Sequence, residues 1–171
     1  MKTITTEEAL RQIYAKIEGN QYAMLTSTGQ DGLLRSRPIA TTEAEHNGEL
    51  WFFIYDDSDK ANEIARNSQV NLSYSDNAGT HVSISGIARV AQDRQRMERL
   101  WNPLFRAWFP KALDEPGIAL LCVAIEECEF WDTTSSKVAQ LFQMAKSILT
   151  GSQANPAEHK EIKLGTATGK S

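Results

Sequence analysis

The segment that decides the fold is residues 22–55, which read YAMLTSTGQDGLLRSRPIATTEAEHNGELWFFIY. Two runs with apolar residues, 22–26 and 33–41, flank the tetrapeptide Gly29-Gln30-Asp31-Gly32. Glycine and aspartate tolerate the dihedral angles that a tight turn needs. A further turn at Gly48 precedes the aromatic run 49–55. The segment therefore predicts strands that pair directly with their neighbours in an antiparallel sheet.

The same pattern continues after this segment. Ser58 is a suitable N-cap for a short helix over about residues 59–67. Alternating or apolar runs bounded by turn residues predict strands on both sides of it. The predicted strands cover 22–26, 33–41, 49–55, 70–75, 80–90, 118–125 and 129–132. Six or so strands separated by tight turns predict a mainly β protein built on an antiparallel barrel with flanking helices.

Helical patterns lie at both ends and in the middle of the chain. Thr5 and Glu8 fit a capping box at the start of a first helix. Residues 93–109 have a helical composition, with a break or a fresh start at Pro103. Residues 133–149 predict a C-terminal helix.

One domain is expected for a chain of 171 residues. We place this domain at residues 5–150. A small, polar tail follows at 151–171, and its last part, 165–171, is expected to be disordered.

The composition excludes several classes of protein. The net charge of -4 argues against nucleic acid as a partner, because binding it usually requires a basic face. No apolar run is long enough for a membrane span, and the N-terminus has no signal-peptide pattern. The two cysteines, Cys122 and Cys128, do not form a CxxC pair. These features predict a cytoplasmic protein.

The common catalytic and nucleotide motifs are absent from the sequence. There is no GxGxxG, no GxxxxGK[ST] and no serine nucleophile elbow. His46, His81 and His159 do not lie at metal-ligand spacing from cysteines or carboxylates, so no metal site is predicted. No catalytic residue can be named from the sequence.

A small group of basic residues remains as a candidate phosphate site. Arg35 and Arg37 lie two apart on a predicted strand, so their side chains share a face. Ser58 and Lys60 lie at the start of the short helix, where free N–H groups and the helix dipole favour an anion. Two ordinary alternatives remain open at this point: a solvated strand face, and surface ion pairs with the aspartates at 56, 57 and 59.

Aromatic residues lie close to this group in the sequence. Trp51, Phe52 and Phe53 are on a predicted strand, and Trp101 and Trp131 follow later. Core packing explains such residues in most proteins, while a flat cofactor ring also needs apolar walls. The aromatic residues alone do not decide between the two interpretations.

Eight short motifs follow one another along the chain: RSRP at 35–38, LWFF at 50–53, SDK at 58–60, VNLSY at 70–74, VSISG at 82–86, WNP at 101–103, AWFP at 107–110 and FWD at 130–132. In order and spacing these motifs resemble the general stress protein 26 group of the pyridoxamine 5'-phosphate oxidase-like, FMN-binding split-barrel superfamily. The resemblance covers roughly residues 7–149.

The resemblance implies a six-stranded antiparallel split β-barrel that forms a homodimer, with two FMN sites at the interface. Arg37 and Lys60 would hold the phosphate, assisted by Ser58. The ribityl chain and the flavin would be lined by Arg35, Ser36 and Pro38, with Trp51, Phe52 and Phe53 beside the isoalloxazine ring. His81 would contact the flavin across the interface or, equally, be a partly buried histidine with satisfied hydrogen bonds. Trp101 and Trp131 would come from the partner chain.

The function that follows is a stress-related flavin-binding protein, and the cofactor is expected to be FMN, with FAD as the alternative. The chain lacks the arginine- and histidine-bearing segment with which pyridoxamine phosphate oxidases grip their substrate, which argues against that activity. One hypothesis is a flavin-dependent oxidoreductase of unknown substrate. The alternatives are a flavin-binding sensor, carrier or buffer without turnover, and an interaction protein with no cofactor.

Overall fold

The computed structural model describes residues 6–42, 45–132 and 158–164. Its elements are α1 (Thr6–Ile17), β1 (Tyr22–Thr28), β2 (Leu34–Ala40), β3 (Glu49–Tyr55), α2 (Asp59–Arg66), β4 (Gln69–Ser75), β5 (Thr80–Ala91), α3 (Arg94–Leu100), the 3-10 turns η1 (Pro103–Ala107) and η2 (Ala112–Asp114), β6 (Ile118–Asp132) and β7 (Glu158–Lys163). The predicted helix 133–149, the capping residue Thr5 and residues 165–171 lie outside the described residues.

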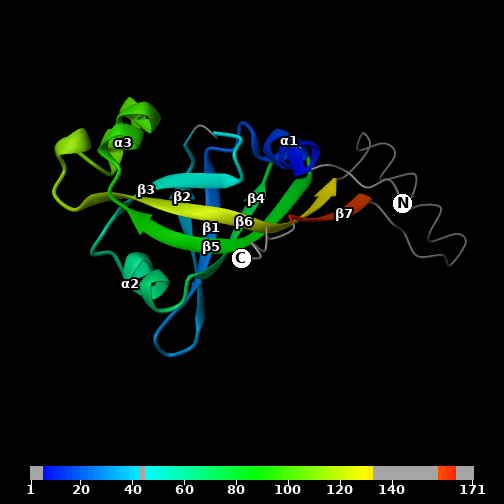
Figure 1. The fold of residues 1–171 in the computed structure, drawn as a ribbon, viewed down its shortest axis with the longest axis horizontal. Coiled ribbons are helices and arrows are strands. Elements are labelled where there is room, and N and C mark those ends of the chain that lie inside the picture. Colours follow the sequence, from blue (N-terminus) through cyan, green and yellow to red (C-terminus); the bar gives the residue numbers. More distant parts are fainter. Residues whose placement is uncertain (1–5, 43–44, 133–157, 165–171) are drawn as a thin grey trace, which may run out of the picture.

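All strand pairs are antiparallel, in the order β2-β1-β4-β5-β6-β3, and β7 pairs with β6. The long strands β5 and β6 curve through the molecule, and the β1–β2 hairpin projects from its lower side (Figure 1). The sheet order begins at β2 and ends at β3, so the described strands form an open sheet, consistent with a split barrel.

The predicted count of six strands is wrong, because the described residues alone form a sheet of seven. β7 reads EHKEIK, with one apolar residue, so its sequence carries no alternation to identify it.

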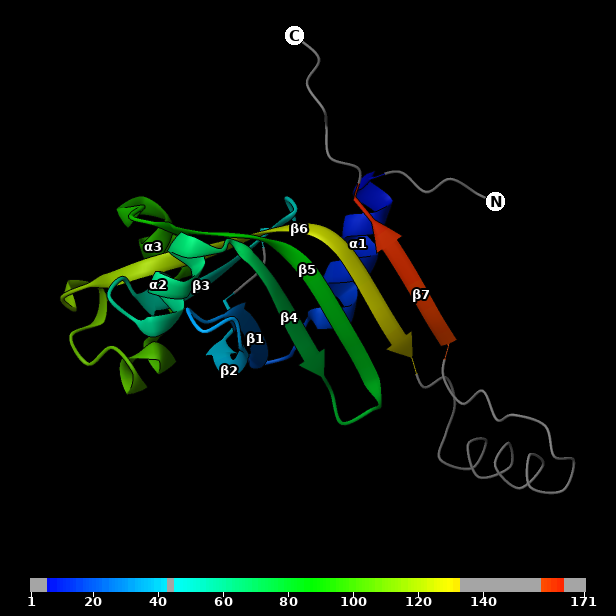
Figure 2. The ribbon, with the colours of Figure 1, turned by 90° about the horizontal axis from the view of Figure 1, so that it is seen from below.

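The predicted strands 118–125 and 129–132 are parts of one strand of 15 residues, β6. Its register against β5 shifts between Ser85 and Gly86, where β6 contains an extra residue, as in a β-bulge. Figure 2 shows β4, β5, β6 and β7 side by side.

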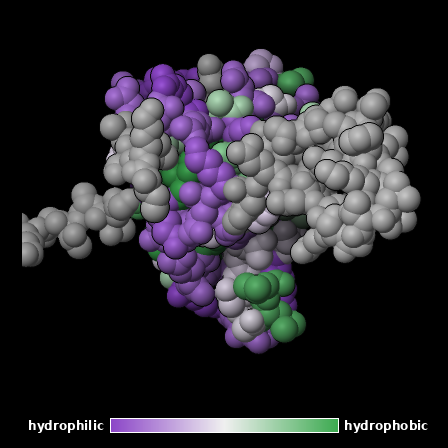
Figure 3. Space-filling view, turned by 90° about the vertical axis from the view of Figure 1, so that its right-hand side faces the viewer, coloured by the Kyte–Doolittle hydropathy of each residue, from purple (hydrophilic) through white to green (hydrophobic). Residues whose placement is uncertain are grey.

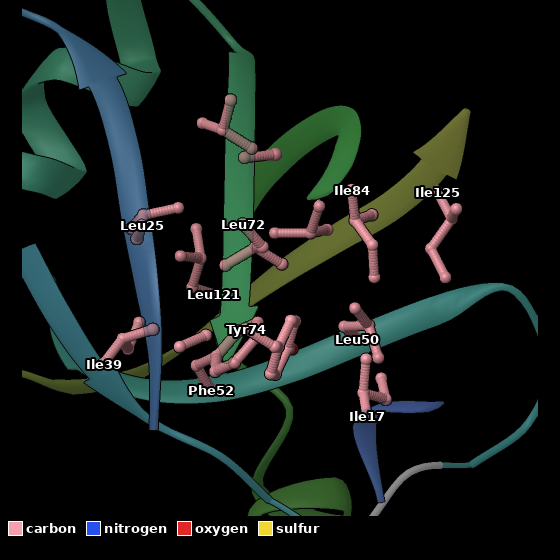
Figure 4. Packing of buried hydrophobic residues seen from close by; sticks show 14 of the residues in the cluster. Ile17, Leu25, Ile39, Leu50, Phe52, Leu72, Tyr74, Ile84, Leu121 and Ile125 are labelled. Carbon is pink, nitrogen blue, oxygen red and sulfur yellow. The ribbon is translucent and has the colours of Figure 1, made fainter. Parts of the chain in front are cut away.

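The main core lies on the concave face of the sheet. Side chains of β1, β4, β5 and β6 meet those of α1 and α2 there, and the interior face of β3 adds Leu50, Phe52 and Ile54 (Figure 4). Trp51 and Phe53 face the opposite side of β3, where α3 and η1 cover them. Because both faces of β3 are buried, its sequence is a continuous apolar run rather than an alternating one.

Gly86 allows β5 to pass close to β6. A Cβ atom at this position would lie 2.3 Å from the backbone oxygen of Ala124 and 3.0 Å from Val123 Cγ1. The Gly86→Ala variant is therefore expected to lose about 1–3 kcal/mol of unfolding free energy, because a backbone atom cannot yield as a side chain can. Urea denaturation measures the loss, with Ser85→Ala as the matched control on the same strand. Equal stability of the two variants would contradict the close approach.

Within the described residues, no helix has both the length and the apolar character that crossing a membrane requires.

Candidate functional site

An aromatic cleft of about 250 Å³ opens between the end of β2, β3 and η1. We call it the lysine cleft, after Lys60 on its wall. Its lining residues are Tyr22, Pro38, Ile39, Ala40, Phe53, Ile54, Tyr55, Lys60, Phe105, Trp108 and Phe109. The rings of Tyr55 and Phe109 are 4.9 Å apart, and Tyr55 Oη donates a hydrogen bond of 2.8 Å to the Trp108 oxygen. These contacts fix the aromatic wall before any ligand binds.

Lys60 is the cation of this cleft. It is half-buried in the first turn of α2 and makes no hydrogen bond or ion pair within the part of the chain that the structure describes. Burial and, after it, the nearby charge of Arg37 lower the pKa of the Lys60 ammonium, while Asp59 raises it. A bound anion would compensate both unfavourable contributions, which makes Lys60 a suitable ligand for a phosphate.

Ser58 fixes the helix that carries Lys60. Its hydroxyl oxygen accepts a hydrogen bond from the Ala61 backbone N–H at 3.4 Å, and the hydroxyl donates to the Tyr55 oxygen at 2.6 Å. The predicted N-cap is thus confirmed. Through these two bonds Ser58 ties the start of α2 to the end of β3, so Lys60 is held on the wall of the cleft.

Arg37 takes part in a compact ionic group that no local sequence pattern predicts, because its partners Ser27 and Glu63 are distant in the chain. Its Nη1 and Nη2 donate to the two Glu63 carboxylate oxygens at 2.7 and 2.8 Å, and Ser27 Oγ donates to Glu63 Oε2 at 2.7 Å. The hydrogen bonds from Arg37 are the largest cause that lowers the pKa of Glu63 to about 2, and the same pair raises the pKa of Arg37. The group joins α2 to β1 and β2 beside Lys60.

The remaining residues of the RSRP segment lie apart from this group. Arg35 makes a bidentate ion pair with Asp31, at 2.6 and 2.8 Å, across the β1–β2 turn. This is a surface ion pair, although its partner is not one of the three aspartates considered above. The Ser36 hydroxyl accepts a hydrogen bond from Thr26, and of these three residues only Pro38 lines the lysine cleft. Any ligand contact of Arg35 or Ser36 remains a prediction.

The predicted aromatic residues have different surroundings. Phe52 lies in the main core, while Phe53 is on the wall of the lysine cleft with Trp101 edge-on to it at 5.4 Å. Trp51 is 3% exposed, and the Arg96 guanidinium lies over its ring at 4.0 Å. Core packing therefore accounts for Phe52, and a cation–π contact holds Trp51 against α3.

His81 and Trp131 lie elsewhere in the chain. They are register partners near the far end of the β5–β6 pair, and neither lines the lysine cleft. His81 is exposed, and its Nδ1 is 3.0 Å from Ser75 Oγ. The structure therefore brings Pro38, Phe53, Ser58, Lys60 and Trp101 together, with Arg37 close by, and leaves this pair outside.

A second, larger cleft of about 480 Å³ continues from the first, and the two share Tyr22, Ala40, Phe105 and Trp108. We call it the histidine cleft, after His46. Its other lining residues are Tyr14, Ile17, Glu18, Gly19, Asn20, Gln21, Thr41, Thr42, His46, Leu50, Trp51, Phe52, Tyr74, Asn102 and Leu104. No local pattern in the sequence predicts this cleft, because its residues come from six separate segments.

Comparisons with known proteins match most of the chain. The family model described as "Pyridoxamine 5'-phosphate oxidase like" matches residues 8–155. Protein bli-3 of Neurospora crassa is 23% identical over 170 residues, which cover 93% of this chain and 81% of that protein.

Solved structures are similar over most of the chain. A candidate general stress protein 26 from a Jannaschia species has a TM-score of 0.70 at 22% identity, covering 90% of this chain and 97% of that one. The general stress FMN/FAD binding protein of Xanthomonas citri has a TM-score of 0.65 at 27% identity, covering 76% of this chain and 92% of that one.

Proposed function

The chain belongs to the pyridoxamine 5'-phosphate oxidase like family, and we propose that it binds a flavin through a phosphate held at Lys60. The observation that carries this proposal is a half-buried lysine, without a hydrogen bond or ion pair among the described residues, in the lining of a cleft walled by aromatic rings. Such a cleft offers one charge for a phosphate and apolar surface for a flat ring.

The other site residues have roles consistent with this arrangement. Arg37 would add its charge to the phosphate site while Glu63 holds both of its terminal nitrogens. Ser58 would assist by fixing the start of α2, and Pro38 and Phe53 would lie beside the ring system. The relative from Xanthomonas citri is named as an FMN/FAD binding protein, and we propose FMN for this chain, with FAD as the alternative.

A visible absorbance spectrum of the purified protein tests the proposal. The expected result is the pair of near-UV and blue bands of oxidised flavin, retained when excess FMN is added and then removed by desalting. A colourless protein that does not retain FMN would refute flavin binding and favour an interaction protein without a cofactor.

A bound flavin would supply the redox chemistry, and the chain would supply binding, orientation and exclusion of water. We propose an oxidoreductase on this basis. A flavin-binding module without turnover is the second candidate, because no carboxylate or histidine of the described residues lines the lysine cleft as an acid or base. Rapid bleaching of the flavin by reduced nicotinamide under anaerobic conditions would select the oxidoreductase, and its absence the binding module.

We also propose that the chain forms a homodimer. Tyr22 and Trp108 line both clefts and are 49% and 45% exposed. Large aromatic side chains are usually more buried than this. Leu33 and Leu34 at the β2 side of the β1–β2 turn are exposed as well. Figure 3 shows an apolar patch, in green, at the lower end of the molecule. A symmetric partner would cover such surface and bring its own His81 and Trp131 toward the opposite cleft.

Light scattering on the purified protein measures the oligomeric state directly. We expect twice the mass of one chain, and the same mass with and without FMN, because apolar rim residues drive the association. A monomer that binds FMN tightly would contradict the interface site.

A further inference from the structure

The two joined clefts differ sharply in charge. The lysine cleft has a cation, whereas no lysine or arginine is among the described residues that line the histidine cleft. The ionisable groups on that lining are the Glu18 carboxylate, the His46 imidazole and three tyrosine hydroxyls. An anionic group would therefore meet a carboxylate and no fixed cation there, while an uncharged molecule would meet no electrostatic penalty.

The wall of the histidine cleft contains a fixed, flat aromatic surface. The rings of Tyr14 and His46 are stacked, with centroids 4.4 Å apart and planes 21° from parallel. Tyr14 Oη accepts a hydrogen bond from the Gly48 backbone N–H at 3.0 Å and lies 3.2 Å from the Glu49 oxygen, to which it donates. These two bonds hold the Tyr14 ring, and the stacking holds His46 on it.

The backbone of His46 adds a second observation. Its φ of 54° is in the left-handed region, which non-glycine residues adopt only at an energetic cost. A residue without the stacked ring would lack the compensating contact with Tyr14. The loop therefore holds an imidazole in a strained conformation on the wall of a cleft.

Two neutral polar groups on this lining are partly committed to the backbone. Thr41 Oγ1 donates to the Asn20 oxygen at 2.6 Å, and Asn102 Oδ1 accepts from the Leu104 N–H at 2.9 Å. The Thr41 oxygen can still accept, and the Asn102 amide can still donate. The cleft thus combines stacked rings with a few neutral hydrogen-bonding groups, in a volume sufficient for a bicyclic molecule.

We infer that the histidine cleft binds an uncharged, flat aromatic molecule, separately from the phosphate-bearing ligand of the lysine cleft. Because the clefts share four residues, the two ligands would lie next to each other. Binding of this molecule does not depend on the proposed function. Exchange of electrons between the molecule and a flavin does depend on it.

The first test compares 1-naphthol with 1-naphthyl phosphate, which differ only by the charged ester, near neutral pH. The Lys60→Ala variant removes the cation of the lysine cleft, and calorimetry measures both affinities. The ring protons of His46, assigned in NMR spectra with a His46→Gln variant, report the place of binding. We expect 1-naphthol to shift the His46 signals but not those of His81, and to bind at least about tenfold more tightly than its phosphate ester. Equal affinities, or unchanged His46 signals, would overturn the inference.

The second test adds a charge to the cleft. Gln21 is exposed and lines the histidine cleft, so Gln21→Arg should fold normally and place a guanidinium there. Gln95→Arg, on exposed α3 surface outside both clefts, is the matched control. In the Lys60→Ala background, Gln21→Arg is expected to tighten binding of 1-naphthyl phosphate by about tenfold, and Gln95→Arg to leave it unchanged. The same affinity in both variants would overturn the charge argument.

The third test separates this inference from the proposed function. Wild-type protein saturated with FMN, as judged by absorbance after desalting, should still bind 1-naphthol with the same His46 shifts. Displacement of 1-naphthol by FMN would overturn the inference, because the flavin itself would then occupy the histidine cleft. If the protein retains no FMN but binds 1-naphthol, the proposed function fails and the assignment of the cleft stands.

Discussion

The Lys60→Ala variant is expected to bind FMN about 10- to 100-fold more weakly than the wild type. Lys60 is the only cation among the described lining residues of its cleft, and a charge-assisted hydrogen bond to a phosphate contributes about 1.5–3 kcal/mol. Burial disfavours the charged form of Lys60, and its ammonium makes no hydrogen bond or ion pair among the described residues, so the variant should be as stable as the wild type or more so. Fluorescence quenching on titration with FMN measures the affinity.

Lys111→Ala is the matched control for this variant. Lys111 is exposed, lies next to η2 and lines neither cleft, so its removal changes the net charge equally without touching the site. Lumiflavin, which has the ring system of FMN but no phosphate, adds a second comparison and should bind both variants alike. If Lys60→Ala retains FMN as tightly as Lys111→Ala does, the phosphate is held elsewhere.

The second large effect is on stability. Glu63→Gln is expected to lower the free energy of unfolding by about 2–3 kcal/mol, because it leaves the Arg37 charge without its counterion. The side chains of Glu63 and Arg37 are 10% and 27% exposed, so the loss should be smaller than for a fully buried pair. Glu98→Gln removes an exposed ion pair with Arg94 and should cost less than about 0.5 kcal/mol. Chemical denaturation compares the two variants.

The pH dependence of the same variant gives an independent check. The pKa of Glu63 is about 2, below its ordinary value of 4.5, so its ionised form is favoured in the folded protein. This stabilisation is complete above pH 4.5 and is lost as the pH falls toward 2. The stability difference between wild type and Glu63→Gln should therefore shrink over that interval. A difference independent of pH would show that packing, and not charge, causes the loss.

Local signals in the sequence predicted most of the elements. The turn at residues 29–32 is present, with Gly32 at a φ of 77°, and Ser58 caps α2 as its position predicts. Pro103 begins a new turn after α3, because proline fits the first position of a helical segment. Each of these features depends on a few neighbouring residues, which is why the sequence reveals it.

The features that the sequence did not reveal depend on distant residues. The Arg37–Glu63 pair joins positions 26 apart, and nothing near Arg37 indicates that an acid on α2 would hold it. The histidine cleft requires the loop before β3 to meet α1 and η1. For the candidate site, local sequence patterns predicted Lys60 and its helix, but the acid beside Arg37 and the second cleft became visible only in the folded chain.

The two-sided pairing of β6 has a consequence for how the protein behaves in concentrated solution. β3 pairs with residues 118–124 of β6, and β7 covers residues 127–132 on the same edge, while β5 occupies the other edge. An uncovered strand edge offers free N–H and C=O groups on which another chain can add a strand, and this is a common start of aggregation. Because β7 pairs along that edge, the backbone groups of residues 127–132 are bonded within the chain, and this part of the longest described strand is not available as a template for fibrils.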